Sequence, residues 1–327
     1  FTSFAVGGGT PLILDEGQLE ELFCLAELFG VHPSRVFTSV ETSPEYTQKS
    51  VLRQLRARGV ERLSMGVQSF NETELKKLKR RPGLGTVVGA LENIVEAGFP
   101  QFNLDLIYGI EGQTVESFMR SLNTALTYRP NELFIYPLYV RPGTRINVRS
   151  TDDIGYAIYK SARELLVGQG FVQTSMRRFV RRETTETEFS CGDEVMLSCG
   201  AGGRSYLGNL HYATPYAVRQ QAIADEIGHY IRTTDFMTAA NGFLLSTEEM
   251  QIRFIIKNLM YHRGVDLAEY EKRFGEKPDR EFTDRGWIEE TGRIVRLTEE
   301  GMAYSDYIGQ AFISPVVRKL MSEYVYP

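Results

Sequence analysis

The sequence is poor in cysteine, and it has no long apolar run. Its 327 residues include three cysteines, at positions 24, 191 and 199. This odd number excludes a disulfide framework and is typical of a protein kept in a reducing compartment. No apolar stretch approaches the roughly 20 residues that cross a bilayer, and a signal-peptide pattern is missing. We therefore expect a cytoplasmic protein without a membrane partner.

Positive charge is not in excess either. The sequence has 37 Lys and Arg residues against 42 Asp and Glu residues, which gives a net charge of −5. A mildly acidic surface has no general attraction for nucleic acid, so we expect no nucleic-acid partner. Because 42% of the residues are apolar, the chain can bury a large core, and this excludes disordered and fibrous classes.

The first half of the chain alternates short β-branched and aromatic runs with amphipathic helical patterns. This alternation indicates βα units and a parallel sheet. Strands are expected over residues 2–6, 35–40, 62–67, 103–108 and 133–139. Helices are expected over residues 16–29, 50–58, 75–79, 86–97, 115–128 and 154–168. Five strand–helix repeats favour a barrel or partial barrel over a doubly wound sheet.

The pattern loosens after residue 170. One strand is expected over 172–180, followed by a polar stretch over 181–188 and a Gly-rich segment over 199–205. No clear βα unit can be placed in this region, so we interpret it as an extension of the barrel and a linker.

The last part of the chain changes class. Ser246 and Glu249 have the spacing of a capping box, which predicts a helix from there to residue 261. A second helix over 267–274, a two-stranded wing over 288–297 and a last helix near Ser314 complete a winged-helix outline. We therefore divide the chain into residues 1–170, 171–244 and 245–327.

Polar residues recur where the apolar strands end. Their separations are 31, 27 and 37 residues, each about one βα unit of roughly 30 residues. In a parallel barrel the carboxyl ends of the strands form the face where ligands bind, so these side chains would share one mouth. The alternative for each residue alone is that polar residues end strands because turns begin there. The four residues are Thr10, Glu41, Gln68 and Asp105.

Three consecutive glycines follow the first expected strand, in the segment Gly7 to Pro11. Glycine lets the backbone approach a ligand closely, and its free N–H and C=O groups can bind an ammonium or a carboxylate. The alternative is a plain turn between a strand and a helix. A nucleotide-binding P-loop is excluded, because the GK[ST] ending is absent.

Taken together, these segments resemble the coproporphyrinogen III oxidase-like branch of the radical SAM superfamily. The resemblance extends over most of the chain, and the string Arg62 to Asn71 with Asp105 to Gly109 is its specific part. The matching segments are Gly7 to Pro11, Glu41 to Pro44, Arg62 to Asn71, Asp105 to Gly109, Gly112 to Thr114, Tyr136 with Leu138, Pro142 to Thr144, and Gly200 to Ser205.

The resemblance implies a fold and a cofactor. The fold would be a partial (β/α)6 radical SAM barrel lacking its first strand, with a winged-helix-like α+β cap at the carboxy terminus. The barrel would bind S-adenosylmethionine across its mouth, with a small-molecule substrate and an electron donor such as a flavodoxin or ferredoxin as partners. Cofactor-binding positions carried over from the family are Gly7, Gly8, Gly9, Thr10, Glu41, Gln68, Arg80 and Asp105.

Physical chemistry is compatible with this assignment. The cofactor carries two cationic groups, which carboxylates and carbonyls can neutralise, and one carboxylate, which suits a guanidinium. Gly8, Gly9 and Thr10 would contact its methionine amino group. Arg80 has an alternative interpretation as a solvated member of the basic run 76–81.

The sequence departs from the family in two ways. A CxxxCxxC loop, whose thiolates hold a 4Fe-4S cluster, normally precedes the GGGTP strand. No such motif is present here, and because the chain opens without Met inside a predicted strand, we expect the cluster cysteines upstream of Phe1. The second departure concerns the substrate: neither the haem-chaperone string nor the coproporphyrinogen oxidase signature stands before residue 200, so we assign the chain to neither group.

Three other features have both a functional and an ordinary interpretation. Arg177 and Arg178, in a basic cluster with Arg181 and Arg182, are candidates for binding substrate carboxylates, although strand edges often carry such charges. Cys191 and Cys199 are expected to be ordinary thiols, not ligands of a second metal. His211 is expected to be structural.

These features lead to three hypotheses of function. The first is a radical SAM oxidoreductase acting on an unidentified, porphyrin-like substrate, whose hydrogen a 5′-deoxyadenosyl radical abstracts. The second is a non-catalytic haem-binding or haem-transfer protein on the same fold. The third, DNA binding by the winged-helix end, is disfavoured by the glutamate pairs near the expected helix and wing.

Overall fold

The computed structural model divides the protein into two compact units. It describes residues 1–80, 83–140, 150–181, 195–215, 217–239, 241–278 and 286–324. The first unit comprises the described residues up to 173 together with 177–181, and the second comprises 174–176 and the described residues from 195 onward. No described helix has both the length and the apolar character needed to cross a membrane. The predicted division at residues 171 and 245 stays a prediction.

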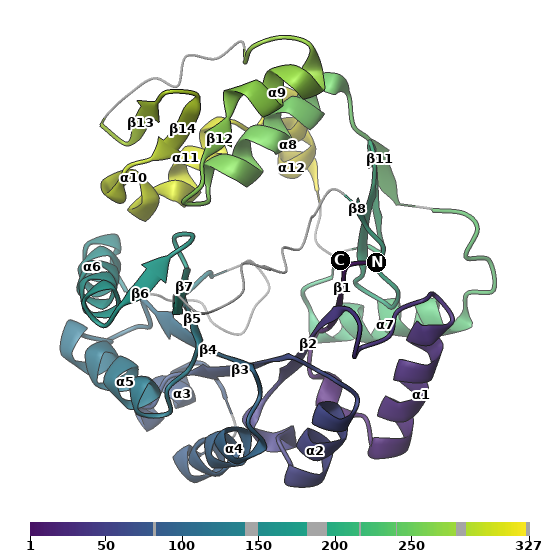
Figure 1. Cartoon of the computed structure of the whole chain (residues 1–327), viewed down its shortest axis with the longest axis vertical. Coiled ribbons are helices and arrows are strands. Elements are labelled where there is room, and N and C mark those ends of the chain that lie inside the picture. Colours follow the sequence, from purple (N-terminus) through teal and green to yellow (C-terminus); the bar gives the residue numbers. More distant parts are fainter. Residues whose placement is uncertain are drawn as a thin grey trace. The chain divides into compact units, whose positions relative to one another are not determined.

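Five parallel strands form the centre of the first unit. They are β1 (Ser3–Val6), β2 (Phe37–Thr42), β3 (Arg62–Gln68), β4 (Gln101–Tyr108) and β5 (Glu132–Pro137), paired in that order. The strands follow one another around an arc, with helices along its outer side (Figure 1). The helices are α1 (Glu16–Glu27), α2 (Lys49–Ala57), α3 (Glu72–Lys77), α4 (Leu84–Ala97), α5 (Val115–Thr127) and α6 (Asp152–Gly168). The predicted βα repeats and parallel sheet are confirmed.

The far edge of this sheet differs from the prediction. Residues 172–180 do not form one strand; they contain β6 (Phe171–Gln173) and β7 (Arg178–Arg181), which pair antiparallel with each other. β7 also pairs antiparallel with β5, so the sheet runs from β1 at one edge to β6 at the other and stays open. The result is a partial barrel whose last two strands form a hairpin.

The two faces of the parallel sheet have opposite chemistry, because successive side chains in a strand point to opposite faces. One set of alternating positions is aliphatic and almost fully buried: Val40, Leu63, Met65, Leu104, Leu106, Leu133 and Ile135. The other set, which we call the inner face, is polar: Ser39, Glu41, Arg62, Ser64, Asn103, Asp105, Glu132 and Tyr136. A polar face on central parallel strands is unusual and makes this side of the sheet the candidate for ligand binding.

Local sequence signals set the helix ends. Asp15 and Gln18 form a capping box at the start of α1, and Thr114 and Ser117 form another at α5. Gly98 ends α4 with φ of 63°, a left-handed conformation that favours glycine. Each cap supplies partners for backbone N–H or C=O groups that the helix itself leaves unpaired.

The second unit begins with a small antiparallel sheet. Its strands are β8 (Val195–Met196), β9 (Arg204–Leu207), β10 (Leu210–Ala213) and β11 (Gly242–Leu244), and helix α7 (Gln220–Arg232) lies between β10 and β11 in the chain. In this unit the stack of His211 on Tyr206, with ring centroids 4.1 Å apart, joins β10 to β9.

The remaining elements have the predicted winged-helix outline. The helices and wing strands are α8 (Thr247–Leu259), β12 (Val265–Asp266), α9 (Leu267–Phe274), β13 (Ile288–Thr291), β14 (Ile294–Leu297), α10 (Glu299–Ala303), α11 (Ser305–Ala311) and α12 (Pro315–Glu323). The predicted capping box at Ser246 is only half formed. Ser246 Oγ accepts from the N–H of Glu249 over 3.2 Å, but the Glu249 carboxylate accepts from Ser314 Oγ instead. Glu249 therefore joins α8 to the start of α12.

Candidate functional site

Glu41 of β2 holds the glycine loop that follows β1. The N–H of Gly8 donates to Glu41 Oε2 over 3.2 Å. A Cβ at Gly7 would lie 2.8 Å from the Glu41 carboxyl carbon, so no larger residue fits without moving that carboxylate. Gly8 and Gly9 have φ values of 86° and 106°, in the region that side chains disfavour. All three glycines are therefore needed for the observed path of the loop.

Gln68 ends β3 in a strained backbone conformation. Its φ is 73°, and the β3–β4 register shifts between Gly66 and Gln68. The side chain folds back over Gly66, where a Cβ would lie 2.5 Å from Gln68 Nε2. Gln68 is 8% exposed, and its side-chain amide has no hydrogen-bond partner among the described residues. The strained backbone and the uncommitted side-chain amide make Gln68 a candidate for contact with a ligand.

Asp105 lies on the next strand, opposite Gly66 in the register. Its Oδ1 accepts from Asn103 Nδ2 over 2.7 Å, and no other hydrogen bond to Asp105 exists among the described residues. Burial raises the pKa of this carboxyl from 3.8 to about 7, against the opposing effects of Asn103 and Arg62. Asp105 therefore changes its charge near neutral pH, which is a property concentrated at functional sites.

Two aromatic rings of β5 extend the inner face beside Asp105. Phe134 pairs with Asp105 in the register, and its ring stacks on that of Tyr136 with centroids 5.5 Å apart. Burial and the nearby Asp105 carboxylate raise the pKa of the Tyr136 hydroxyl well above its ordinary value. The hydroxyl thus stays protonated and can donate a hydrogen bond to a ligand at any physiological pH.

A buried charge network lies further along the same face. Glu132, 1% exposed, accepts from Arg62 Nε over 2.7 Å and from Arg178 Nε. Arg62 also donates to Ser39 Oγ over 2.9 Å. This network, which we call the Glu132 triad, joins β3, β5 and β7 across the inner face.

The Glu132 triad includes one of the two candidate substrate-binding arginines. Arg178 is 3% exposed and its guanidinium contacts Glu132, so it has a structural partner. Arg177 is half-buried; its guanidinium donates to the hydroxyl of Tyr139 and lies over that ring. Of the pair, Arg177 is the better placed to reach a substrate, and both assignments stay predictions. Arg182 of the same cluster, like Pro142 to Thr144 of the family motif, lies outside the described residues.

Two predicted cofactor residues, within the described part of the chain, form no hydrogen bond with the other candidate residues. Thr10 precedes the short 3-10 helix Pro11–Ile13, and its side chain makes no capping hydrogen bond. Arg80 is exposed after α3, and its N–H donates to the carbonyl of Leu75. The structure therefore brings together Gly7, Gly8 and Glu41 by contact, and Gln68 and Asp105 by strand register. The roles of all of these residues stay predictions.

A second buried carboxylate supports the loops around the site. Glu74 of α3 is 4% exposed and accepts from Ser69 Oγ, Gln113 Nε2 and Ser117 Oγ, over 2.6, 2.9 and 2.6 Å. Gln113 in turn accepts from the N–H of Gly109 over 2.8 Å. Glu74 thereby ties the loop after β3, which begins at Gln68, to the loop after β4.

Sequence reasoning found the strand ends and missed the strand interiors. Asn103, Tyr136 and Glu132 belong to the inner face but were not predicted as site residues. The available signal was period-two polarity inside otherwise apolar strands, as in Asn103 and Asp105 around Leu104. Glu74 offered no such signal, because it sits in a charged run that resembles a solvated helix.

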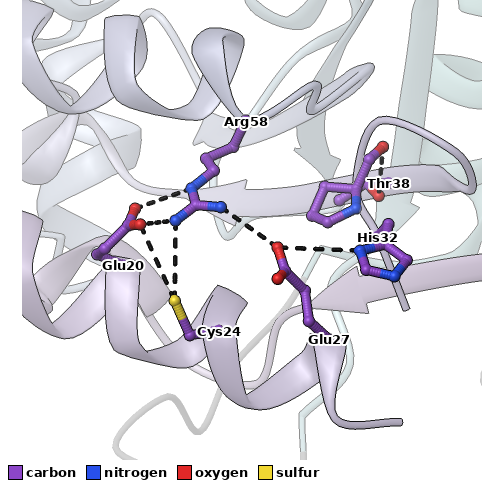
Figure 2. Close-up of polar contacts among 7 residues, drawn as sticks. Glu20, Cys24, Glu27, His32, Thr38 and Arg58 are labelled. Carbon is purple, nitrogen blue, oxygen red and sulfur yellow. Dashed lines mark hydrogen bonds and ion pairs between the residues drawn. The ribbon is translucent and has the colours of Figure 1, made fainter. Parts of the chain in front are cut away.

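The described cysteines do not fit an iron–sulfur cluster. Cys24 is exposed on α1, where its sulfur lies 3.8 Å from Arg58 Nη2 and 4.0 Å from a Glu20 oxygen (Figure 2). Arg58 also pairs with Glu27 over 3.3 Å, so this cluster ties α1 to the end of α2. Cys199 is exposed, and Cys191 lies outside the described residues. Within the described part of the chain, no three side chains of suitable type gather as metal ligands.

The inner face does fit a zwitterionic, sulfonium-bearing ligand. Such a ligand needs acceptors for its cations and hydroxyls, and Glu41 and Asp105 supply carboxylate oxygens there. It also needs donors and acceptors that are not already used, which the Gln68 amide supplies. The positive φ values of Gly8 and Gly9 leave an open backbone beside Glu41.

Comparison with known proteins gives two family matches. Residues 2–125 match the radical SAM superfamily, and residues 245–304 match the HemN C-terminal domain. The heme chaperone HemW of Bacillus subtilis is 26% identical over 334 residues, which is 94% of this chain and 84% of HemW. Oxygen-independent coproporphyrinogen III oxidase of Escherichia coli is 26% identical over 326 residues, 93% of this chain and 68% of the oxidase.

The fold has a counterpart among solved structures. Coproporphyrinogen III oxidase (HemN) from Escherichia coli, described as a radical SAM enzyme, matches with a TM-score of 0.78 at 22% identity. The match covers 95% of this chain and 77% of that chain. At this level of identity the likeness establishes the fold alone.

Proposed function

Because the chain belongs to the radical SAM superfamily, in the branch that carries a HemN C-terminal domain, we propose that it is a radical SAM oxidoreductase acting on a porphyrin-like substrate. S-adenosylmethionine, when bound beside a reduced 4Fe-4S cluster, supplies the 5′-deoxyadenosyl radical for hydrogen abstraction. The part of this protein is to bind and orient that cofactor on the inner face.

The unpaired amide of Gln68 carries the proposal. The positive φ and the shifted register at Gln68 carry a conformational cost, and among the described residues its side-chain amide makes no hydrogen bond that would offset it. A ligand that accepts from Nε2 and donates to Oε1 would satisfy both groups. Glu41 then fixes the glycine loop, whose backbone groups contact the methionine end, and Asp105 accepts from a donor of the ligand.

A non-catalytic role in haem transfer is the second candidate. It is favoured by the similarity to HemW, which is called a heme chaperone and matches a larger share of its own length than the oxidase does. Both candidates use the same fold, so cofactor binding alone does not separate them. Turnover separates them.

The test is a pair of measurements on the native gene product, purified without oxygen. With dithionite, S-adenosylmethionine and coproporphyrinogen III, we expect 5′-deoxyadenosine to accumulate and to increase with substrate. Gln68→Ala should abolish it, while Lys49→Ala, which removes an exposed pair with Glu96, should not. Stoichiometric haem uptake with no deoxyadenosine would favour the haem-transfer role and overturn the oxidoreductase.

A further inference from the structure

Asn103 lies fully buried on the inner face, between two polar side chains. Its Nδ2 donates to Ser64 Oγ on β3 and to Asp105 Oδ1 on its own strand, each over 2.7 Å. Ser64 and Asn103 are direct partners in the β3–β4 register. Both N–H groups of the amide are therefore used, and in two different directions.

The opposite end of the Asn103 amide is buried and makes no hydrogen bond within the part of the chain that the structure describes. The atom concerned is Oδ1. The cost of leaving a buried acceptor unpaired offsets much of what two hydrogen bonds contribute to stability. Stability alone is therefore a weak reason for asparagine here. The orientation of the amide is nevertheless fixed by Asp105, because a flipped amide would lose its hydrogen bond to that carboxylate and set Oδ1 against it, whereas the Ser64 hydroxyl can pair with either end of the amide.

Among the described residues, the Asn103 amide is the only group that forms a hydrogen bond with the Asp105 carboxylate. Its Oδ1 is taken by Asn103, and its second oxygen has no hydrogen-bond partner among the described residues. Gly66, which faces Asp105 across the register, carries no side chain that could support it. The orientation of the free Asp105 oxygen thus depends on Asn103, and the position of the Asn103 amide depends in turn on its hydrogen bond to Ser64.

We infer that Asn103 is a positioning residue: it anchors one oxygen of Asp105 to the sheet, with Ser64 as its own anchor, so that the other oxygen is presented to the ligand. This inference rests on the proposed S-adenosylmethionine site. It adds Asn103 as a residue that acts on the cofactor through Asp105, by setting the orientation and the charge of that carboxyl group.

The charge effect follows from the groups around Asp105. Arg62 of β3 favours its ionised form, and Glu41 of β2 and Glu132 of β5 oppose it; Tyr136 of β5 stays neutral. The N–H of Asn103 lowers the pKa of Asp105, second in size only to the raising effect of burial. Without that donor, Asp105 should hold its proton to a pH above about 7.

Asn103→Leu tests the inference, because leucine has a similar volume and no donor. In calorimetric titrations with S-adenosylmethionine, we expect binding to be about three- to tenfold weaker at pH 7 and its pH profile to move to higher pH. A weakening that persists at high pH, where Asp105 is ionised in both proteins, would measure the lost orientation. Ser64→Ala should move the profile in the same direction by less, and provides the milder variant if Asn103→Leu folds poorly.

A second readout needs no ligand. Since the pKa of Asp105 is raised on folding, its contribution to stability declines as pH rises from about 4 to about 7. In Asn103→Leu this decline in melting temperature should extend to higher pH, and Asp105→Asn should remove it. If the parent chain failed to bind S-adenosylmethionine while this shift appeared, the proposed function would fail and the positioning role would stand. Unchanged profiles in both experiments would overturn the inference.

Discussion

At the scale of single residues, Gly7 shows how one missing side chain sets a contact between strands. The Glu41 carboxylate occupies the space that a Cβ at Gly7 would fill, at 2.8 Å from the Glu41 carboxyl carbon. Gly7→Ala should push this exposed carboxylate away and break its hydrogen bond to Gly8. We expect S-adenosylmethionine to bind about tenfold more weakly, with less than about 1 kcal/mol lost from stability because Glu41 can move into solvent.

The matched control for this substitution is Gly89→Ala. Gly89 lies in α4 with open space around its Cα, so alanine there should stabilise the helix by about 0.5–1 kcal/mol and leave ligand binding unchanged. Calorimetry and urea unfolding of both variants separate the two effects. Parental affinity in Gly7→Ala would show that the glycine loop is not part of the ligand site.

His211 makes a second prediction at this scale. Its ring stacks on Tyr206, whose other neighbour is the Arg253 guanidinium, 3.9 Å from the ring centroid. Burial first, then Arg253 and Arg204, lower the pKa of His211 below its ordinary value. As the pH falls through about 6.5, His211 therefore takes up a proton in the unfolded chain before it does so in the folded protein. The free energy of unfolding should decrease progressively below that pH.

His211→Phe keeps a flat ring on Tyr206 and removes the titration. We expect its unfolding transition to lose less melting temperature between pH 7 and pH 5 than that of the parent. The variant should be at least as stable as the parent at pH 7, because the buried Nε2 of His211 has no hydrogen-bond partner among the residues that the structure describes. Parallel stability curves for the two proteins would contradict a lowered pKa of this half-buried histidine.

At the scale of elements, the Glu132 triad joins the parallel strands to the terminal hairpin. Arg62 and Arg178 share the Glu132 carboxylate, and all three side chains are at most 12% exposed. Glu132→Gln removes the shared anion and leaves buried guanidinium groups, which costs about 3–5 kcal/mol in comparable cases. We expect a loss of that order in urea unfolding of the first unit.

Two further variants make this measurement specific. Replacing Glu132 by Leu together with both arginines by Met should recover most of the loss, since well-packed apolar residues can substitute for buried ion pairs. Lys49→Ala, at a pair whose side chains are 55% and 65% exposed, should cost under about 1 kcal/mol. If Glu132→Gln cost no more than Lys49→Ala, the triad would not hold the hairpin in place.

Elements with strong local signals were the ones that the sequence could predict. Helix α9 has its predicted bounds, because Asp266 caps it and Gly275 ends it in a left-handed conformation. The hairpin of β6 and β7 was not predicted, because the turn between Gln173 and Arg178 contains neither glycine nor proline. The hydrogen bond between Ser314 and Glu249 could not be predicted from the sequence either, because only the tertiary fold brings these residues together.

The candidate site divides in the same way. Glycines and polar residues at strand ends have a recognisable spacing, so Gly7, Glu41, Gln68 and Asp105 could be singled out. The residues that orient them act through tertiary contacts: Asn103 with Ser64 on the neighbouring strand, and Glu74 of α3 with Gln113 in the loop after β4. The partners in each pair are 39 residues apart in the chain, so no local pattern marks them.

At the scale of the whole molecule, each of the two family matches falls within one of the two structural units. The radical SAM match lies within the first unit, and the HemN C-terminal match lies within the second. The inner face belongs to the first unit alone, so cofactor binding can be measured without any assumption about how the units are arranged. The proposed radical chemistry requires an iron–sulfur cluster as well.

The cysteines of this chain predict the outcome of iron binding. A 4Fe-4S cluster in this superfamily needs three thiolates that converge on one centre. Cys24 lies on the surface beside Arg58, Cys199 is exposed in the second unit, and Cys191 is eight residues from Cys199 with no CxxxCxxC spacing. The 327-residue chain should therefore stay colourless after anaerobic reconstitution with iron and sulfide, with far fewer than about four irons per chain.

A variant with all three cysteines replaced by serine is the control and should behave identically. About four irons in the parent and none in the variant would make these cysteines cluster ligands and require a different assignment.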